Sequence, residues 1–544
     1  MKRSIYALAV VTAVFTLSQT PPLVANPQGS GSARLDLVEA TVDDLLKAVQ
    51  TGLVTIEELT GMYLNRIAAF DDNGPGVNAI LHLNANAAEQ ASELDAQRQG
   101  GVARSPLYGI PVLLKDNIDT ADMPTTAGSV ALAGSLPPDD AFITRKLRAA
   151  GAVIIGKATL TEFANFIAIG MPAGYSSLGL FGFNPYDPRP VPPGFPNADG
   201  RPVLTTGGSS SGSGIGVNAN FAAVAIGTET SGSILSPASA NGVVGIKPTV
   251  GLVSRDGIIP ITADQDTAGP IARTVRDAAI LLGVIAGHDP SDPATAPCLI
   301  PGNCFSDYTQ FLDKHALEGV RLAAIIPNNR RDFMNAAIAV LRDLGAVVDE
   351  IQAPGGQLGI CVAYPIPAGC SSVLLYGQKR DLNTYLANTP DAPHHTIAEI
   401  VAFNATYVPP MKYGQAIFEA AAQVDVTAGS ADTLRYQADR AYDLANSRGP
   451  LDAIYANYDA ILASANSFAG TPAKAGYPSI TVPGGFLPPV APIANPFPSG
   501  ITFSGPAFSE PRLIAFAYAF EQATRHRQPP ASTPPLPTDT IVRP

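Results

Sequence analysis

The chain has 544 residues, of which 46% are hydrophobic and 15% charged; this is the composition of a globular protein with a large core and excludes a disordered chain. The 34 basic and 46 acidic residues give a formal net charge of −12, which argues against a nucleic-acid or anionic-membrane partner. With 50 glycines and 50 prolines, turns and loops should be plentiful.

The N-terminus is typical of a signal peptide. Lys2 and Arg3 form a positive start, and the apolar run Ile5–Leu17 that follows is short for a membrane span. We expect cleavage after Ala25, so that residues 1–25 are removed; a core helix and an uncleaved anchor are the alternatives. No other stretch is apolar enough to span a membrane. The mature protein is therefore expected to be exported, periplasmic or extracellular, with no stable membrane span.

Two helices are expected between Leu37 and Phe70. Thr41 is a candidate N-cap for the first, which Gly52 should end. Thr55, with a glutamate three positions later, has the spacing of a capping box for the second. Apolar residues at helical spacing after Thr55 predict that this helix packs on the core.

An apolar strand over Tyr108–Leu114 should follow a strand over Asn78–Leu83 and an alanine-rich helix over Asn86–Gln99. Lys115 stands at the end of the apolar strand. Because this strand has no alternating polar face, both of its faces should be buried. Burial lowers the pKa of a lysine, so a neutral amine becomes available as a base.

Strands and helices continue to alternate, with a helix over Asp140–Ala150 and a buried strand over Ala152–Gly156. The alternation favours an α/β fold with helices on both faces of the sheet. Gly174–Leu204 is rich in glycine, proline and aromatic residues. We expect an ordered active-site loop there, with disorder as the alternative.

Two clusters of glycine and serine flank a short apolar strand, Phe221–Ile226. Residues 207–214 read GGSSSGSG, residues 227–234 read GTETSGSI, and GIKPT follows at 245–249. Glycine lets backbone N–H groups approach a ligand closely, and serine hydroxyls can attack a carbonyl or relay a proton. One such cluster is usually a loop, but two around one strand indicate a site.

These motifs, together with GIPVLLKD at 109–116 and QDTAGP at 265–270, resemble the amidase signature family, whose members hydrolyse amides with a Ser–Ser–Lys triad. The resemblance runs from about Leu37 to Gln522 and thins between about Pro290 and Gly449. It implies the amidase-signature fold, an α/β fold in which helices cover both faces of one large mixed β-sheet. One amidase domain would then occupy residues 26–527.

The resemblance assigns catalysis to three side chains. The family's two catalytic serines are 24 residues apart, as are Ser209 and Ser233. Ser233 would be the nucleophile, Ser209 the bridging serine and Lys115 the base. The resemblance also places a cis peptide bond before Ser209. Ser210 would hydrogen-bond within the same network.

The oxyanion hole would be formed by backbone N–H groups of the second glycine–serine cluster, those of Thr230, Ser231, Gly232 and Ser233. No cofactor and no metal are expected.

The substrate should be a small-molecule or peptide amide. Many family members have arginine two residues after the nucleophile, where this chain has Leu235. Glu229, Leu235 and NGVVG at 241–245 resemble the peptide-amidase branch, which removes C-terminal amide groups from peptides. A general aliphatic or aryl-acyl amidase that releases ammonia or an amine is the alternative. The sequence does not indicate an oligomeric state.

Four other interpretations fit less well. A phosphate-binding glycine loop would need a preceding strand and a lysine at P-loop spacing. A binding protein that kept the fold would have no use for an intact triad. The export signal and acidic charge oppose an amidase subunit of a tRNA-dependent amidotransferase. A Ser–His–Asp triad would need a histidine near the serines, and no motif there contains one of the six, His82, His288, His315, His394, His395 and His526.

The four cysteines fall into two close pairs. An exported protein meets an oxidising compartment, where such pairs form disulfides. Of the three possible connectivities we favour Cys298–Cys304 and Cys361–Cys370, because short loops close easily. A zinc site is the alternative, although the spacing is not that of C-x-x-C.

Residues 353–449 have no clear pattern, and the resemblance implies that they shape the substrate mouth. Gln528–Pro544 is a proline-rich tail that we expect to be flexible. The other expected elements are a helix over Val275–Ile285, a strand over Val320–Ile326, a helix over Arg331–Leu344, strands over Ala346–Ile351, Tyr458–Leu462 and Gly476–Pro483, and a helix over Leu513–Thr524.

Overall fold

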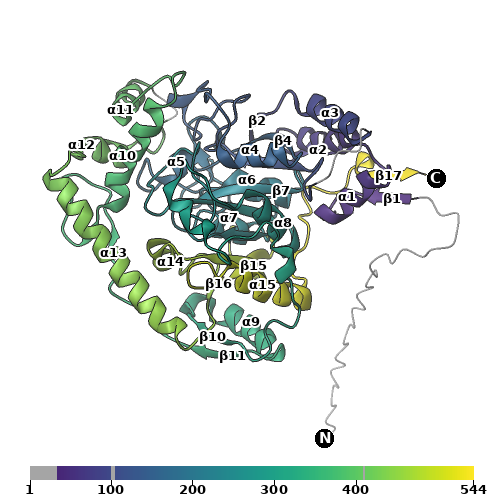
Figure 1. Cartoon of the computed structure of the whole chain (residues 1–544). Helices are drawn as coiled ribbons and strands as arrows, with labels where there is room; N and C mark the ends of the chain where they lie inside the picture. The colour runs from purple at the N-terminus through teal and green to yellow at the C-terminus, as the bar shows by residue number, and fades with distance from the viewer. Residues whose placement is uncertain (1–32, 100–104, 408–410, 544) are drawn as a thin grey trace, which may run out of the picture.

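The computed structural model describes residues 33–99, 105–407 and 411–543 (Figure 1). The expected signal peptide, residues 1–25, lies outside these ranges. In the described part of the chain, no helix combines the length and the apolar character needed to cross a bilayer.

Most of the strands belong to one sheet. The strands are β1 (Ala33–Asp36), β2 (Ile80–Leu83), β3 (Pro111–Lys115), β4 (Val153–Ala158), β5 (Tyr175–Ser176), β6 (Leu180–Phe181), β7 (Val224–Glu229), β8 (Val244–Lys247), β9 (Thr267–Ala272), β10 (Arg321–Ala324), β11 (Val347–Glu350), β12 (Gly359–Ile360), β13 (Cys370–Ser371), β14 (Ala460–Ser464), β15 (Ser479–Leu487), β16 (Phe497–Ser504) and β17 (Thr540–Arg543).

The α-helices connect these strands or flank the sheet. They are α1 (Val42–Gln50), α2 (Ile56–Phe70), α3 (Ala87–Gln99), α4 (Phe142–Ala149), α5 (Glu162–Asn165), α6 (Ser211–Asn218), α7 (Leu235–Ala240), α8 (Val275–Ile285), α9 (Arg331–Asp343), α10 (Val373–Ala387), α11 (Ile397–Thr406), α12 (Ala416–Gln423), α13 (Ala431–Tyr455), α14 (Gly470–Ala475) and α15 (Glu510–Thr524).

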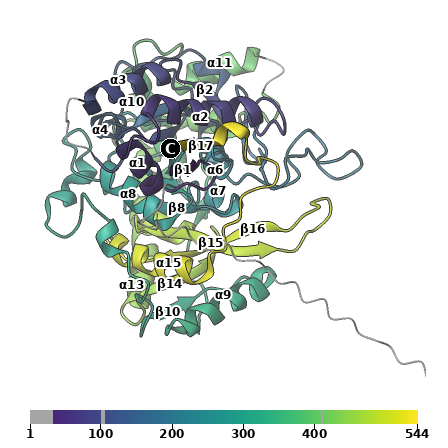
Figure 2. The same ribbon diagram turned by 90° about the vertical axis from the view of Figure 1, so that its right-hand side faces the viewer.

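The central sheet has eleven strands in the order β11-β10-β14-β16-β15-β8-β9-β7-β3-β4-β2. It is mixed, because β7, β3 and β4 run parallel to one another whereas β8, β9, β15 and β16 alternate in direction. Helices α6 and α7 pack on one side of it and α8 on the other (Figure 2). The α/β class and the large mixed sheet predicted above are confirmed.

The first two helices begin as their caps predict. Thr41 and Thr55 each form a complete capping box, with Asp44 and Glu58 as the reciprocal acceptors. The side chains of α2 at helical spacing, among them Leu59 and Tyr63, are buried. Local sequence alone therefore fixed the start of these helices.

Three central strands, β8, β9 and β16, were missed from the sequence. Strand β9 lies between β7 and β8 although it contains Gly269 and Pro270, residues that are rare in central strands. Strand β16 directly follows the proline-rich stretch PPVAPIANP at 488–496. Strands β9 and β16 form because adjacent strands pair with them. The pairing partners, rather than the local strand propensity, decide whether such a segment becomes a strand.

The loop expected over Gly174–Leu204 is ordered. It opens with the β5–β6 hairpin and continues with local turns that pair Asp187 with Arg189 and Asp199 with Arg201. Residues 353–449 form the helices α10 to α13 around a second hydrophobic core, which lies on the left flank of the molecule in Figure 1.

The C-terminal tail was expected to be flexible, and the structure corrects this. Strand β17 pairs antiparallel with β1, and the side chain of Asp539 forms a buried ion pair with Arg66 of α2. Arg66 also donates to the carbonyl oxygens of Thr533 and Pro534. A fully buried guanidinium must be paired with hydrogen-bond acceptors and a counter-charge. Because the tail supplies these partners to Arg66, it is held against α2 although it has little apolar surface to bury.

The cysteines pair as predicted. Cys298 joins Cys304 and Cys361 joins Cys370, with Cα–Cα distances of 5.0 and 5.1 Å. All four cysteines are therefore engaged, which leaves none for a zinc site.

Candidate active site

The site lies where two parallel strands of the central sheet end. Leu114 of β3 pairs with Ile226 of β7. Lys115, one residue beyond Leu114, and Thr228, two residues beyond Ile226, therefore meet at the carboxyl edge of the sheet. In α/β folds, this edge is where side chains from several strands converge on a ligand.

Lys115 is completely buried among hydroxyl groups. Its ammonium nitrogen donates to Ser209 Oγ at 2.7 Å, to Thr228 Oγ1 at 2.8 Å and to the Thr228 carbonyl oxygen at 3.2 Å. Desolvation lowers the pKa of Lys115 from 10.5 to about 7, although the negative charges of Asp266 and Glu229 oppose the shift. A lysine in this position can lose its proton near neutral pH.

Ser209 and Ser210 precede helix α6 and are both fully buried. The peptide bond between Gly208 and Ser209 is cis. The Ser210 hydroxyl donates to the Thr228 carbonyl oxygen at 3.1 Å and accepts from the Thr228 N–H at 3.2 Å. The Ser210 N–H in turn donates to the Ser233 carbonyl oxygen at 3.2 Å. Ser210 thus ties the end of β7 to the loop that carries Ser233.

Glu229 shapes that loop, a role the sequence did not reveal. Its carboxylate accepts the N–H groups of Gly232 at 2.6 Å, Ile234 at 2.7 Å and Leu235 at 3.1 Å. The turn also places Gly232 at φ +83°, a conformation that favours glycine. Three hydrogen bonds to one buried carboxylate hold Ser233 at a fixed position between β7 and α7.

The expected set of oxyanion-hole donors is therefore altered. The N–H of Gly232 is taken by Glu229 and cannot also bind an oxyanion. For the N–H groups of Thr230, Ser231 and Ser233, no acceptor is found among the described residues. The sequence could not separate these cases, because they depend on which way each peptide plane faces.

Asp266 is a second carboxylate near the site, and its sequence motif did not indicate a role for it. It accepts from the Thr230 hydroxyl at 2.5 Å and from the N–H groups of Ile261 and Thr262 at 2.8 and 2.9 Å. Desolvation raises its pKa to about 6. The motif QDTAGP contained this residue, but only the fold brings it beside the second serine cluster.

Ser233 faces a pocket of about 290 Å³. Thr230, Ser231 and Gly208 line it together with Ser233, and residues 353–449 contribute Ile360 and Leu374 to the lining. None of the six histidines lines this pocket. In the described structure the hydroxyls of Ser209 and Ser233 share no hydrogen bond, and Ser233 remains 8% exposed.

The fold is of the α/β class, with one large mixed sheet. Its site combines a buried lysine–serine pair with a second serine that faces a pocket. Such a site can activate a serine hydroxyl, which is typical of an enzyme. Comparisons with known proteins give the family. The family model described as Amidase matches residues 58–514, so the chain belongs to the amidase family and is an enzyme that hydrolyses amides.

The similarity to individual relatives extends over nearly the whole chain. A probable amidase of Arabidopsis thaliana is 38% identical over 512 residues, covering 92% of this chain and 93% of that protein. The crystal structure of the native peptide amidase from Stenotrophomonas maltophilia has 40% identity and a TM-score of 0.78, covering 90% of this chain and 98% of the other. An amidase family protein from Bacillus anthracis has 35% identity and a TM-score of 0.81, with 91% and 92% covered.

Proposed function

We propose that the protein is a serine hydrolase that cleaves carboxamide C–N bonds through an acyl-enzyme. Ser233 Oγ attacks the carbonyl carbon, its proton passes to Ser209, and the Ser209 proton passes to neutral Lys115. When the C–N bond breaks, the proton returns along the same path to the leaving nitrogen, which departs as ammonia or an amine. Water then attacks the ester by the same relay and releases the carboxylic acid.

The observation that carries this proposal is the 2.7 Å hydrogen bond between Lys115 Nζ and Ser209 Oγ in a fully buried setting. A serine hydroxyl is a weak nucleophile at its ordinary pKa and needs an adjacent base. The pKa of about 7 for Lys115 suits such a base, because general-base catalysis is most efficient when the pKa lies near the working pH.

The developing oxyanion would be stabilised by backbone N–H groups that follow β7. Those of Thr230, Ser231 and Ser233 fit, because they border the pocket and have no acceptor among the described residues. Gly232 contributes to the turn rather than to the oxyanion, since its N–H binds Glu229.

The substrates we propose are peptides with a C-terminal amide, from which ammonia is released. The 40% identity to a peptide amidase supports this choice, as does Leu235 two residues after Ser233. Ammonia release should be compared across peptide amides, aryl amides and short aliphatic amides. Turnover restricted to aryl or aliphatic amides would favour the general amidase instead.

We also propose that the protein is exported, with both disulfides formed. The charged and apolar N-terminal segment supports export, and the two cysteine pairs at disulfide distance are compatible with an oxidising compartment. Intact-mass measurement of protein recovered from its native compartment should give a chain that lacks residues 1–25 and has no free thiol. Retention of Met1 would contradict cleavage.

A further inference from the structure

A second pocket opens beside the one that holds Ser233. Its volume is about 390 Å³, and it shares Ser231, Ile360 and Leu374 with the first pocket. Because these three residues face both pockets, a substrate whose amide lies at Ser233 can reach the second pocket with its acyl part.

The lining of the second pocket combines four apolar side chains, Leu358, Ile360, Leu374 and Phe468, with polar ones that include Gln357 and Lys474. Leu374 and Phe468 are buried, whereas Ile360 is 44% exposed, so part of its side chain is free to contact a bound group.

Ile360 belongs to a segment held in a fixed shape, residues 357–372, which we call the strap. Strand β12 pairs with β13 inside it, and the Cys361–Cys370 disulfide closes it directly after Ile360. Arg435 of α13 donates to the Cys370 carbonyl oxygen at 2.9 Å.

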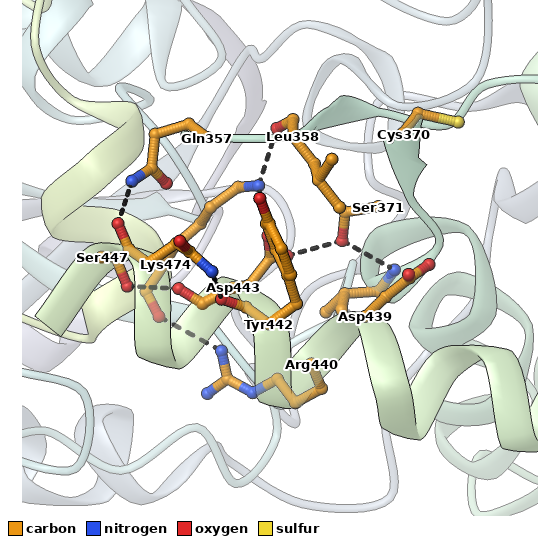
Figure 3. Close-up of polar contacts among 12 residues, drawn as sticks. Gln357, Leu358, Cys370, Ser371, Asp439, Arg440, Tyr442, Asp443, Ser447 and Lys474 are labelled. Carbon is orange, nitrogen blue, oxygen red and sulfur yellow. Dashed lines mark hydrogen bonds and ion pairs between the residues drawn. The ribbon is translucent and has the colours of Figure 1, made fainter. Parts of the chain in front are cut away.

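A buried ion pair attaches the strap to the body of the protein (Figure 3). Lys474 of α14 binds Asp443 of α13 at 2.6 Å and donates to the Leu358 carbonyl oxygen at 2.8 Å. Asp443 also accepts from the Ser371 hydroxyl at 2.5 Å. Both ends of the strap are thus fixed by the same pair of charged groups, which positions Ile360 over the pocket.

We propose that the second pocket is the subsite for a large apolar side chain on the residue that carries the scissile amide, and that the strap sets this preference through Ile360. This inference rests on the proposed function and adds to it the side chain that the enzyme selects.

The test uses two substrates that differ only in that side chain, N-acetyl-phenylalanine amide and N-acetylglycine amide. We expect the wild type to have a kcat/KM at least about tenfold higher for the phenylalanine amide, since even one methylene in an apolar pocket changes selectivity by about 10–200-fold. Ile360→Ala should reduce this ratio several-fold. Because Ile360 is partly exposed, the variant should fold. An unchanged ratio in Ile360→Ala, or no preference in the wild type, would overturn the subsite.

The disulfides supply a matched pair of variants. Cys361→Ser with Cys370→Ser releases the strap and should lower the ratio, mainly by raising KM for the phenylalanine amide. Cys298→Ser with Cys304→Ser removes a bond of similar span that lines neither pocket, so its ratio should equal that of the wild type. Equal effects from both pairs would show general loosening and contradict a role for the strap.

A binding measurement separates this inference from the proposed function. Calorimetry with the Ser233→Ala variant reports the affinity for the two amides without turnover. Tighter binding of the phenylalanine amide supports the subsite even if no ammonia is released by the wild type, an outcome that would count only against the proposed function. Equal affinities would overturn the subsite.

Discussion

The ammonium nitrogen of Lys115 lies 2.7 Å from the hydroxyl oxygen of Ser209, although 94 residues separate the two in the chain. Strand β3 delivers the lysine and the turn before α6 delivers the serine, and both side chains are fully buried. This pair is the basis of the first two predictions.

Removal of any member of the relay should abolish most of the activity. Ser233→Ala should reduce ammonia release to background because no ester can form. Lys115→Ala and Ser209→Ala should each reduce kcat by about 10³-fold or more, since groups that act as a unit fail together. The double variant Lys115→Ala with Ser209→Ala should be little worse than the worse single variant. Multiplicative losses in the double variant would contradict the relay.

Labelling identifies the nucleophile independently of turnover. A fluorophosphonate should modify Ser233 in the wild type, slowly in Lys115→Ala and not at all in Ser233→Ala. Peptide mapping that found the label on Ser209 or Ser210 would assign the nucleophile differently. Circular dichroism of each variant supplies the folding control.

Activity should rise with pH through neutrality. Below a pKa of about 7, Lys115 is protonated and cannot accept the Ser209 proton, so log kcat/KM should fall with unit slope towards acid. Above that pH the amine is neutral and the rate should level off. The measurement is a pH profile of ammonia release. A rate that is flat from pH 5 to 8 would exclude Lys115 as the base.

The Asp266→Asn variant tests whether the pH dependence of activity comes from Lys115 or from the nearby Asp266, whose own pKa is raised to about 6. The negative charge of Asp266 raises the pKa of Lys115, so its removal should shift the inflection of the profile to lower pH. If the inflection belonged to Asp266 itself, this variant would remove it instead.

Glu229 should be a positioning residue for the nucleophile. Glu229→Gln replaces a carboxylate that accepts three N–H groups with an amide that can accept through only one oxygen. We expect kcat to fall by about 100-fold with a small change in KM, since a displacement of about 1 Å costs that much. Slower fluorophosphonate labelling of Ser233 should accompany the loss.

The control for Glu229 is Asp277→Asn. Asp277 is also a fully buried carboxylate that accepts a backbone N–H, that of Val42, but it lines none of the pockets around Ser233. It should lower the free energy of unfolding and leave the labelling rate unchanged. Equal slowing in both variants would show that Glu229 acts only through overall stability.

The C-terminal tail should contribute to stability. Asp539→Ala leaves the buried guanidinium of Arg66 without its counter-charge, and removal of one partner of a buried pair costs about 3–5 kcal/mol. Urea unfolding monitored by circular dichroism measures the change. Glu58→Gln, which breaks the exposed pair with Arg543 of the same tail, should cost less than about 1 kcal/mol. A tail that detaches without loss of stability would contradict this prediction.

Local sequence determined several features completely. The caps at Thr41 and Thr55 fixed the starts of α1 and α2, and the apolar run before Lys115 fixed a strand buried on both faces. The spacing of the cysteines favoured the two disulfides that the structure shows over the other connectivities. These features depend on residues a few positions apart, whose geometry the backbone alone constrains. The glycine and serine clusters also indicated where the site lies.

Only the tertiary structure decided how the site is completed and how the chain ends. Glu229 occupies the Gly232 N–H, Asp266 reaches Thr230, and the strap brings Ile360 to the pocket. The sequence of the tail predicted a flexible segment, whereas in the structure Asp539 of the tail forms an ion pair with Arg66. In each case the decisive partner comes from another element or depends on the direction of one peptide group. Burial makes such partners obligatory, because a polar group removed from water must be paired, and the sequence records the group but not the partner.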